Sequence, residues 1–529
     1  MSRRLKILTG AGIVLGLAIF IPVIHHYQLR AATEAYIAEL KAQGEPLELA
    51  QVIPLPVLPG KNGAPLITNA LAQLYASPNA TNWVVGNNEP YGMNQLIPGK
   101  EMAGWHEPVI HSADTWPHDL TNTWDEADAQ LAARQNDLDA LRSLIERPTL
   151  DFRMDYSDIR DLGLPFHLAQ LKLAVQWLEA SEYYSLHQDK TAEAGTDVRA
   201  MLALIKGLTQ EHYEISQLVR LALIRMSAYA TWNILQATNV SDESLAHLQA
   251  DWVSLELTKP LRESFLFERV NELRMFDGFR QSPTNLPLWL GSIFMQKGYD
   301  YEQVGEGASA RWVFVDKSSR LKKLMNKISI PWVEAKWRWF WSYDDQVHSL
   351  QIWGVVLDGA RQLETNHSFL STQAFVETNF VRLNADSLTN YPFEIAAYNT
   401  ASQLRTIQHA ARAEVAKNIV VTAVALKRYE LRQQQLPESL AELVPDFLKA
   451  VPTDYVNGQP LRYRPNADGT FLLYSVGANG KDDGGNPALE KAAEASNYYD
   501  WQQDNVLDWV WPQPATEEEI QNYYAHPPK

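Results

Sequence analysis

The chain has 529 residues, of which 46% are hydrophobic and 21% are charged, so it can form a large folded core and more than one domain. Its formal net charge of −17 argues against nucleic acid as a main partner, because phosphate binding requires a concentrated basic surface. Cysteine is absent, which excludes disulfide bonds, thiolate metal sites and a cysteine nucleophile.

Residues 1–30 predict a membrane anchor. Arg3, Arg4 and Lys6 precede an apolar run over residues 7–24. About 18 helical residues cover roughly 27 Å, which is enough to cross the hydrocarbon core of a bilayer. The basic flank favours an orientation that leaves the rest of the chain outside the cytoplasm. No small-x-small cleavage site follows the run, so we expect an uncleaved anchor, with a cleaved signal peptide as the alternative.

Residues 31–125 predict a connector followed by irregular loops. Residues 31–43 continue the helical pattern of the anchor, whereas residues 44–66 are rich in proline and predict an extended segment. Residues 76–125 are rich in Asn, Gly, Pro and Trp, a composition that is typical of long loops.

Residues 126–399 predict a helical body. Apolar residues recur there at helical spacing, in segments of about 15–25 residues with short connections. Ser241 or Asp242 can cap one of these helices. Residues 282–312 are rich in Gly and Pro and predict a loop. The pattern favours a multi-helix bundle or an irregular array of helical hairpins.

Residues 400–490 predict a small α+β module with a short antiparallel sheet. A long helix is expected from about Thr400 to Gln434, and Pro437 ends it. A short second helix is expected over residues 438–447, and residues 491–529 form an acidic tail.

Two strands and an acidic loop complete this module. Residues 461–464 and 470–474 alternate apolar and polar side chains, and residues 466–469 between them read as a hairpin turn. A glycine-rich loop follows, and it carries Asn479, Asp482 and Asp483.

This order of elements resembles the C-terminal domain of the major pseudopilin of type II secretion. The resemblance covers about residues 400–490 and implies a calcium ion bound in the terminal loop. Asn479, Asp482 and Asp483 occupy the comparable stretch, and calcium prefers such oxygen ligands on a loop that glycines allow to curl. The alternative is an acidic turn that is exposed to solvent.

The chain also departs from that family. Residues 8–13 contain no Glu at the start of the apolar run, and no prepilin peptidase site precedes it. Asp454 is followed by Tyr455, where the family pattern has Asp-Pro. Fibre assembly is therefore not expected. The remaining helical body resembles uncharacterised bacterial membrane-anchored proteins, a resemblance that implies no function.

Other candidate sites are less specific. His106, Glu107 and His111 lack the one-turn spacing of a zinc metalloprotease motif. With Asp114 and His118 they allow a loop-borne zinc site, although polar histidines are common in loops. No phosphate-binding loop, nucleophile elbow or dinucleotide fingerprint is present.

Aromatic and charged residues inside the helical body leave further alternatives open. Residues 317–343 mix cations with tryptophans, which suits a membrane interface, a ligand groove or packing between helices. Gln217, Arg220, Glu268 and Arg269 lie on otherwise apolar helices. They can form buried ion pairs, face solvent or line a polar functional pocket.

Together these patterns predict a mainly α protein with an N-terminal transmembrane helix and a small α+β C-terminal module. We expect a single-pass protein of the bacterial inner membrane, anchored through residues 7–24, with the bulk of the chain in the periplasm. Its expected role is that of a non-enzymatic interaction or scaffold protein with an unidentified protein partner, linked to secretion or the cell envelope. Gly12 and Gly16 allow self-association of the anchor, or are ordinary small residues of a membrane helix. The alternative function is an exported hydrolase with its active site in the Trp- and His-rich loops of residues 80–125.

Overall fold

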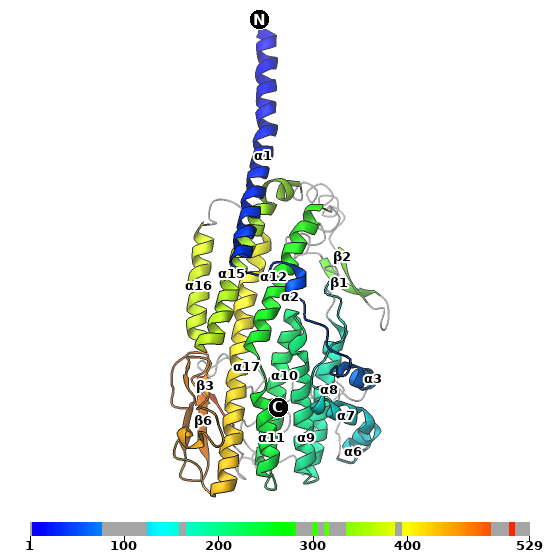
Figure 1. The fold of residues 1–529 in the computed structure, drawn as a ribbon, viewed down its shortest axis with the longest axis vertical. Coiled ribbons are helices and arrows are strands. Elements are labelled where there is room, and N and C mark those ends of the chain that lie inside the picture. The colour runs from blue at the N-terminus through cyan, green and yellow to red at the C-terminus, as the bar shows by residue number, and fades with distance from the viewer. Residues whose placement is uncertain are drawn as a thin grey trace, which may run out of the picture.

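The N-terminal helix α1 (Arg3–Ala42) enters a body of packed helices (Figure 1). This computed structural model describes the backbone of residues 3–76, 124–157, 165–281, 299–304, 311–316, 335–386, 394–487 and 507–513. Helix α1 includes the expected anchor and the expected helical continuation without a break.

A search of the described residues found no helix that is long and apolar enough to cross a membrane. Residues 1–19 and Pro22, which include most of the predicted anchor, lie outside the residues whose side chains are described. The anchor therefore stays a prediction.

The mainly helical fold that the sequence predicts is confirmed. The other α-helices are α2 (Leu49–Val52), α3 (Ala64–Tyr75), α6 (Trp124–Ala133), α7 (Gln135–Arg142), α8 (Phe166–His187), α9 (Thr191–Gly207), α10 (Glu214–Gln236), α11 (Asp242–Val253), α12 (Thr258–Gln281), α15 (Ser342–Asn366), α16 (Phe369–Asp386) and α17 (Glu394–Gln433). The predicted cap of α11 is present, because the Ser241 hydroxyl accepts from Ser244 N at 3.1 Å.

Two segments differ from the sequence-based expectation. The expected extended connector contains α2 and the first turn of α3. The expected loop of residues 282–312 overlaps an antiparallel hairpin, because β1 (Tyr299–Val304) pairs with β2 (Arg311–Asp316). Strand β1 alternates tyrosines with acidic residues at its start, and β2 has a run of aromatic and β-branched residues over 312–315. Such residues favour strands, and this preference prevails over the nearby glycines.

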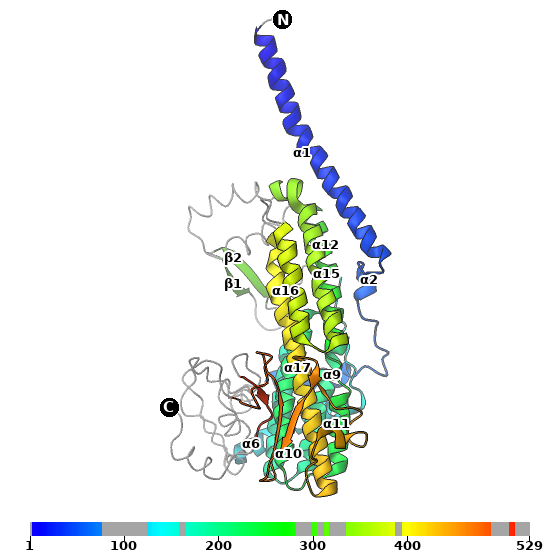
Figure 2. The same cartoon turned by 90° about the vertical axis from the view of Figure 1, so that its left-hand side faces the viewer.

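The C-terminal module packs on α17, as Figures 1 and 2 show. Its sheet has the order β5 (Arg462–Pro465), β6 (Phe471–Ser475), β7 (Trp509–Val510), all antiparallel. Strands β3 (Thr453–Asp454) and β4 (Gln459–Pro460) form a separate short pair. The predicted hairpin turn is confirmed, whereas the expected helix over residues 438–447 is only a 3₁₀ turn, Leu440–Leu443.

One buried apolar core extends through the body and the module. It includes Leu71 of α3, Val175 of α8, Val424 of α17, Leu473 of β6 and Trp509 of β7. Helix α17 packs against α10, α11 and α15 on one side and against β6 on another. The module therefore shares its longest helix with the body, and the division near residue 400 stays a prediction.

Candidate functional site

The glycine-rich loop after β6 brings two of the three predicted calcium ligands together. Asn479 Nδ2 donates to Asp483 Oδ2 at 2.9 Å. Asp482 points toward the sheet instead, where the Tyr474 hydroxyl donates to Asp482 Oδ1 at 2.9 Å and Arg462 Nε lies 3.4 Å from Oδ2. The Tyr474 hydrogen bond is the main reason that the pKa of Asp482 lies below its ordinary value, so this carboxylate is ionised.

The loop is held from its other side by Asp508. This carboxylate is fully buried and accepts the backbone N–H of Gly485 at 2.8 Å and of Asn486 at 3.0 Å. Gly477 has a φ of +64°, and a Cβ there would overlap the backbone of Leu507, so glycine is required where the two segments meet.

A second buried carboxylate, Asp454, ties the β3–β4 pair to β6. It accepts the backbone N–H of Val456 and of Val476, both at 3.0 Å, and the Ser475 hydroxyl at 2.8 Å. The sequence singled out Asp454 only as a departure from the pseudopilin pattern. Sequence reasoning did not identify Asp508 as a site residue. The one local feature that sets it apart in the acidic tail is an apolar residue on either side.

The loop oxygens have the chemistry that calcium prefers, since carboxylates and amide oxygens are hard donors. An ion shared by all three predicted ligands would require Asp482 to turn away from Tyr474 toward Asp483. Within the described ranges, no group of three or more His, Asp or Glu side chains is arranged to hold a metal ion. Calcium binding by Asn479, Asp482 and Asp483 therefore stays a prediction.

If the loop binds calcium, amide hydrogen exchange over residues 471–487 should slow in calcium compared with chelator. A ligand that binds only the closed loop, at a hundredfold excess over its Kd, should slow exchange through local opening by about 100-fold. The double variant Asp482→Ala, Asp483→Ala should lose this effect, whereas Asp468→Ala in the neighbouring hairpin turn should retain it. Equal exchange of the unmutated chain in the two buffers would show that the loop is an acidic turn.

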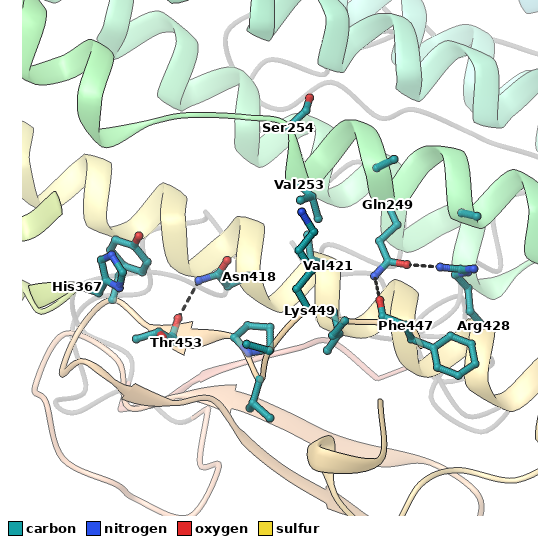
Figure 3. A pocket seen from close by; sticks show the side chains of 17 residues that line it. Gln249, Val253, Ser254, His367, Asn418, Val421, Arg428, Phe447, Lys449 and Thr453 are labelled. Atoms are coloured by element: carbon teal, nitrogen blue, oxygen red, sulfur yellow. Dashed lines mark hydrogen bonds between the residues drawn. The ribbon is translucent and has the colours of Figure 1, made fainter. Parts of the chain in front are cut away.

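An open groove lies where the module meets the helical body (Figure 3). Its cavity has a volume of about 610 Å³ and is bounded by α11, by α17 and by residues 447–455. Val253, on α11, is 50% exposed at its rim, and Figure 3 shows Lys449 extending across toward α11. The groove combines apolar walls with a few cations and amides.

Polar contacts fix the walls of this groove. Gln249 Nε2 donates to Phe447 O at 2.8 Å, and Arg428 Nη1 donates to Gln249 Oε1 at 2.7 Å. At the other end, Asn418 Nδ2 donates to Thr453 O at 2.8 Å. These residues come from three distant segments, and no local sequence pattern connects them.

Two of the polar residues that the sequence singled out support the backbone. Gln217 Nε2 donates to Leu208 O at 3.1 Å. Arg220 is fully buried, and its guanidinium donates to Ile205 O at 2.8 Å and to the carbonyl of Glu256. Both side chains satisfy carbonyl groups around the ends of helices, so they have a structural role and do not line the groove.

Glu268 and Arg269 lie on α12. Burial raises the pKa of Glu268 to about 7, and Glu268 accepts the backbone N–H of Glu214 at 3.2 Å. Arg269 is 2% exposed and forms the buried ion pair that was one of the predicted alternatives, with Glu45 Oε2 at 2.8 Å. Arg361 Nη2 contacts Glu45 Oε1 at 2.7 Å. Burial would raise the pKa of Glu45, but the two arginines hold it below its ordinary value.

The remaining candidates divide between described and undescribed residues. Residues 77–123, which include the histidines of the predicted zinc site and all but the last two of residues 80–125, lie outside the described residues. Of the Trp-rich segment, residues 335–343 are described. Trp337 is buried and stacks on Phe276 at 6.0 Å between ring centroids, whereas Trp339 is 49% exposed.

Comparison of the chain with protein-family models, with curated proteins and with solved structures found no match.

Proposed function

We propose that this chain is a membrane-anchored, periplasm-facing interaction or scaffold protein with a pseudopilin-like module, linked to secretion or the cell envelope. The observation that carries the proposal is the continuity from α1 to the module. Helix α1 passes directly into the body, and the module packs at the end of the body that lies away from the N-terminal half of α1 (Figures 1 and 2). Such an arrangement suits a protein that holds a binding module at a fixed distance from a membrane.

Contacts at the end of α1 support this proposal. Glu45 lies three residues after the end of α1 and pairs with Arg269 of α12 and Arg361 of α15. Thr33, within α1, donates from its hydroxyl to Tyr343 O at 3.1 Å. The lower part of α1 is thus attached to the body by charged and neutral hydrogen bonds in addition to apolar contacts.

The pseudopilin-like character of the module rests on its order of elements. A long helix, a proline-closed turn, the β5–β6 hairpin and a glycine-rich acidic loop follow one another in the expected sequence. The apolar groove between this module and α11 is the surface that we propose for the protein partner.

In cells that express the full chain, we expect it to sediment with inner membranes and to resist extraction by alkaline carbonate. A photo-crosslinking amino acid at Val253, in the groove, should give a discrete adduct. The same amino acid at Val381 of α16, which is 69% exposed, should give none. Equal labelling from both positions, or none from either, would contradict the proposed partner surface.

The hydrolase alternative has its own test, because its predicted site is a part of the sequence, residues 80–125, different from the residues that line the groove. Turnover of an ester, peptide or glycosidic substrate by the purified full chain, abolished by one substitution in residues 80–125, would replace the scaffold proposal.

A further inference from the structure

Aromatic side chains gather where α1 leaves the body. We call Tyr27, His26, Trp339 and Tyr343 the aromatic collar. Tyr27 is 62% exposed and Trp339 is 49% exposed, whereas His26 joins α1 to the body. Its ring lies 4.9 Å from the Trp339 ring and 5.3 Å from the Tyr343 ring, between centroids, and its Nδ1 lies 3.0 Å from Trp339 O.

A π-helix, Trp337–Trp341, sets the direction of Trp339. Trp337 is turned inward, where its Nε1 donates to Asp345 Oδ2 at 2.9 Å and its ring stacks on Phe276. Two residues further along, Trp339 lies on the opposite, outer side. The large exposed ring of Trp339 is therefore held in place by a buried neighbour.

The height of the collar follows from the helical rise of α1. His26 comes two residues after Ile24, the last residue of the predicted membrane-spanning run, so it lies about 3 Å further along the helix axis. The headgroup region on each side of the hydrocarbon core is roughly 5–8 Å thick. Because Trp339 contacts His26, its ring lies at the depth of that region if residues 7–24 span the bilayer.

Cations accompany these rings. Lys336 Nζ lies 4.3 Å above the Trp341 ring, and Arg280 Cζ lies 4.2 Å above the Tyr343 ring. The Arg280 side chain is 11% exposed and pairs with Asp277 Oδ1 at 3.0 Å, so it supports the Tyr343 ring from within the body. Rings at headgroup depth beside a lysine are the combination that favours an interface with anionic lipids.

We propose that the aromatic collar lies in the headgroup region of the bilayer and holds the top of the body against the membrane surface. The partner is the lipid surface itself, and Trp339 is the main contact from the body. This inference rests on the proposed anchor, and it adds a second membrane contact that is far from the anchor in sequence.

The absence of cysteine allows a direct measurement of depth, since a single introduced cysteine can carry a nitroxide spin label. The full chain is reconstituted into vesicles of phosphatidylethanolamine and phosphatidylglycerol. Labels are placed by Trp339→Cys, by Tyr27→Cys as the reference for the anchor, and by Val253→Cys as the control. Val253 is 50% exposed, close to the 49% of Trp339, but it lies at the groove.

The measured quantity is the rate at which the label collides with oxygen, divided by the rate at which it collides with a water-soluble nickel chelate. We expect this ratio to be several-fold higher at residues 339 and 27 than at residue 253. A label at residue 339 that matches residue 253, while residue 27 reports the interface, would overturn the collar and leave the anchor intact. Water-exposed labels at all three positions would overturn the anchor and the collar together. A label at Lys336→Cys repeats the measurement with Trp339 retained. This control shows whether removal of the Trp339 ring itself changes the depth of this part of the body.

Discussion

The free energy of unfolding of the full chain is expected to fall as the pH rises from 5 to 9, and Glu179→Gln should remove a large part of that fall. Glu179 and Glu182 both lie on α8, and they are 2% and 0% exposed. Glu182 Oε2 has only a long contact with Asn233 Nδ2, at 3.5 Å. Within the described part of the chain, Glu179 Oε2 and Glu182 Oε1 have no hydrogen-bond partner.

Burial disfavours the charged form of both groups. It raises the pKa of Glu179 to about 8, and it raises that of Glu182 well above its ordinary value, with a further contribution from the charge of Glu179. An unfolded chain releases these protons near pH 4.5, whereas the folded chain retains them. The folded state therefore binds more protons between these pH values, and stability decreases as pH rises.

The expected loss is about 1.4 kcal/mol per pH unit for each group, or on the order of 4 kcal/mol from Glu179 between pH 5 and pH 8. Glutamine has no proton to lose, so Glu179→Gln should flatten this part of the profile. Urea titrations of the full chain in detergent at several pH values measure the effect.

Glu193→Gln on α9 is the matched control, because that side chain is 64% exposed and near Lys190. It should leave the pH dependence unchanged. If Glu179→Gln and the unmutated chain lose the same stability between pH 5 and pH 9, Glu179 does not hold a proton in the folded state.

Arg269→Ala should destabilise the full chain by about 3 kcal/mol, since it removes the buried one of the two arginines that contact the partly buried Glu45 carboxylate. Besides Glu45, Arg269 supports the connector, because its Nη2 donates to Pro46 O at 2.8 Å. Arg361→Ala removes the other partner of Glu45. Its side chain is 39% exposed, so the expected cost is about 1 kcal/mol or less.

Comparing the two variants separates the effect of burial from the effect of charge, because each variant removes one of the two arginines that contact the Glu45 carboxylate. Urea titration gives the two free energies, and hydrogen exchange over residues 43–48 shows whether the segment after α1 opens in Arg269→Ala alone. Equal destabilisation by the two substitutions would show that the buried position of Arg269 adds nothing.

Helical periodicity was enough to predict most of the body. The stripe of α17 that includes Ile407, Val415 and Ile419 is buried as expected. The β1–β2 hairpin was missed because the glycines and prolines around it outweighed the short alternation of β1 and the short apolar run of β2. Strand β7 has only two residues, too few to show any periodicity.

The candidate sites were harder to predict because they join distant segments. The sequence located the acidic loop but not Asp508, which follows it only after residues 488–506. For the Trp-rich segment, a wheel drawn at α-helical spacing places rings on all sides. At that spacing Trp337 and Trp339 already lie on opposite sides, about 200° apart, but the wheel cannot say which of the two faces the body.

The late position of β7 in the chain also sets an order of assembly. During synthesis, β5 and β6 emerge well before Trp509, so the open edge of β6 lacks its neighbour until residues 507–513 emerge. Trp232 of α10 depends on the same segment, because its Nε1 donates to Pro512 O at 3.0 Å. An unpaired strand edge readily joins other strands, so the module is most exposed to mispairing between the emergence of β6 and that of β7.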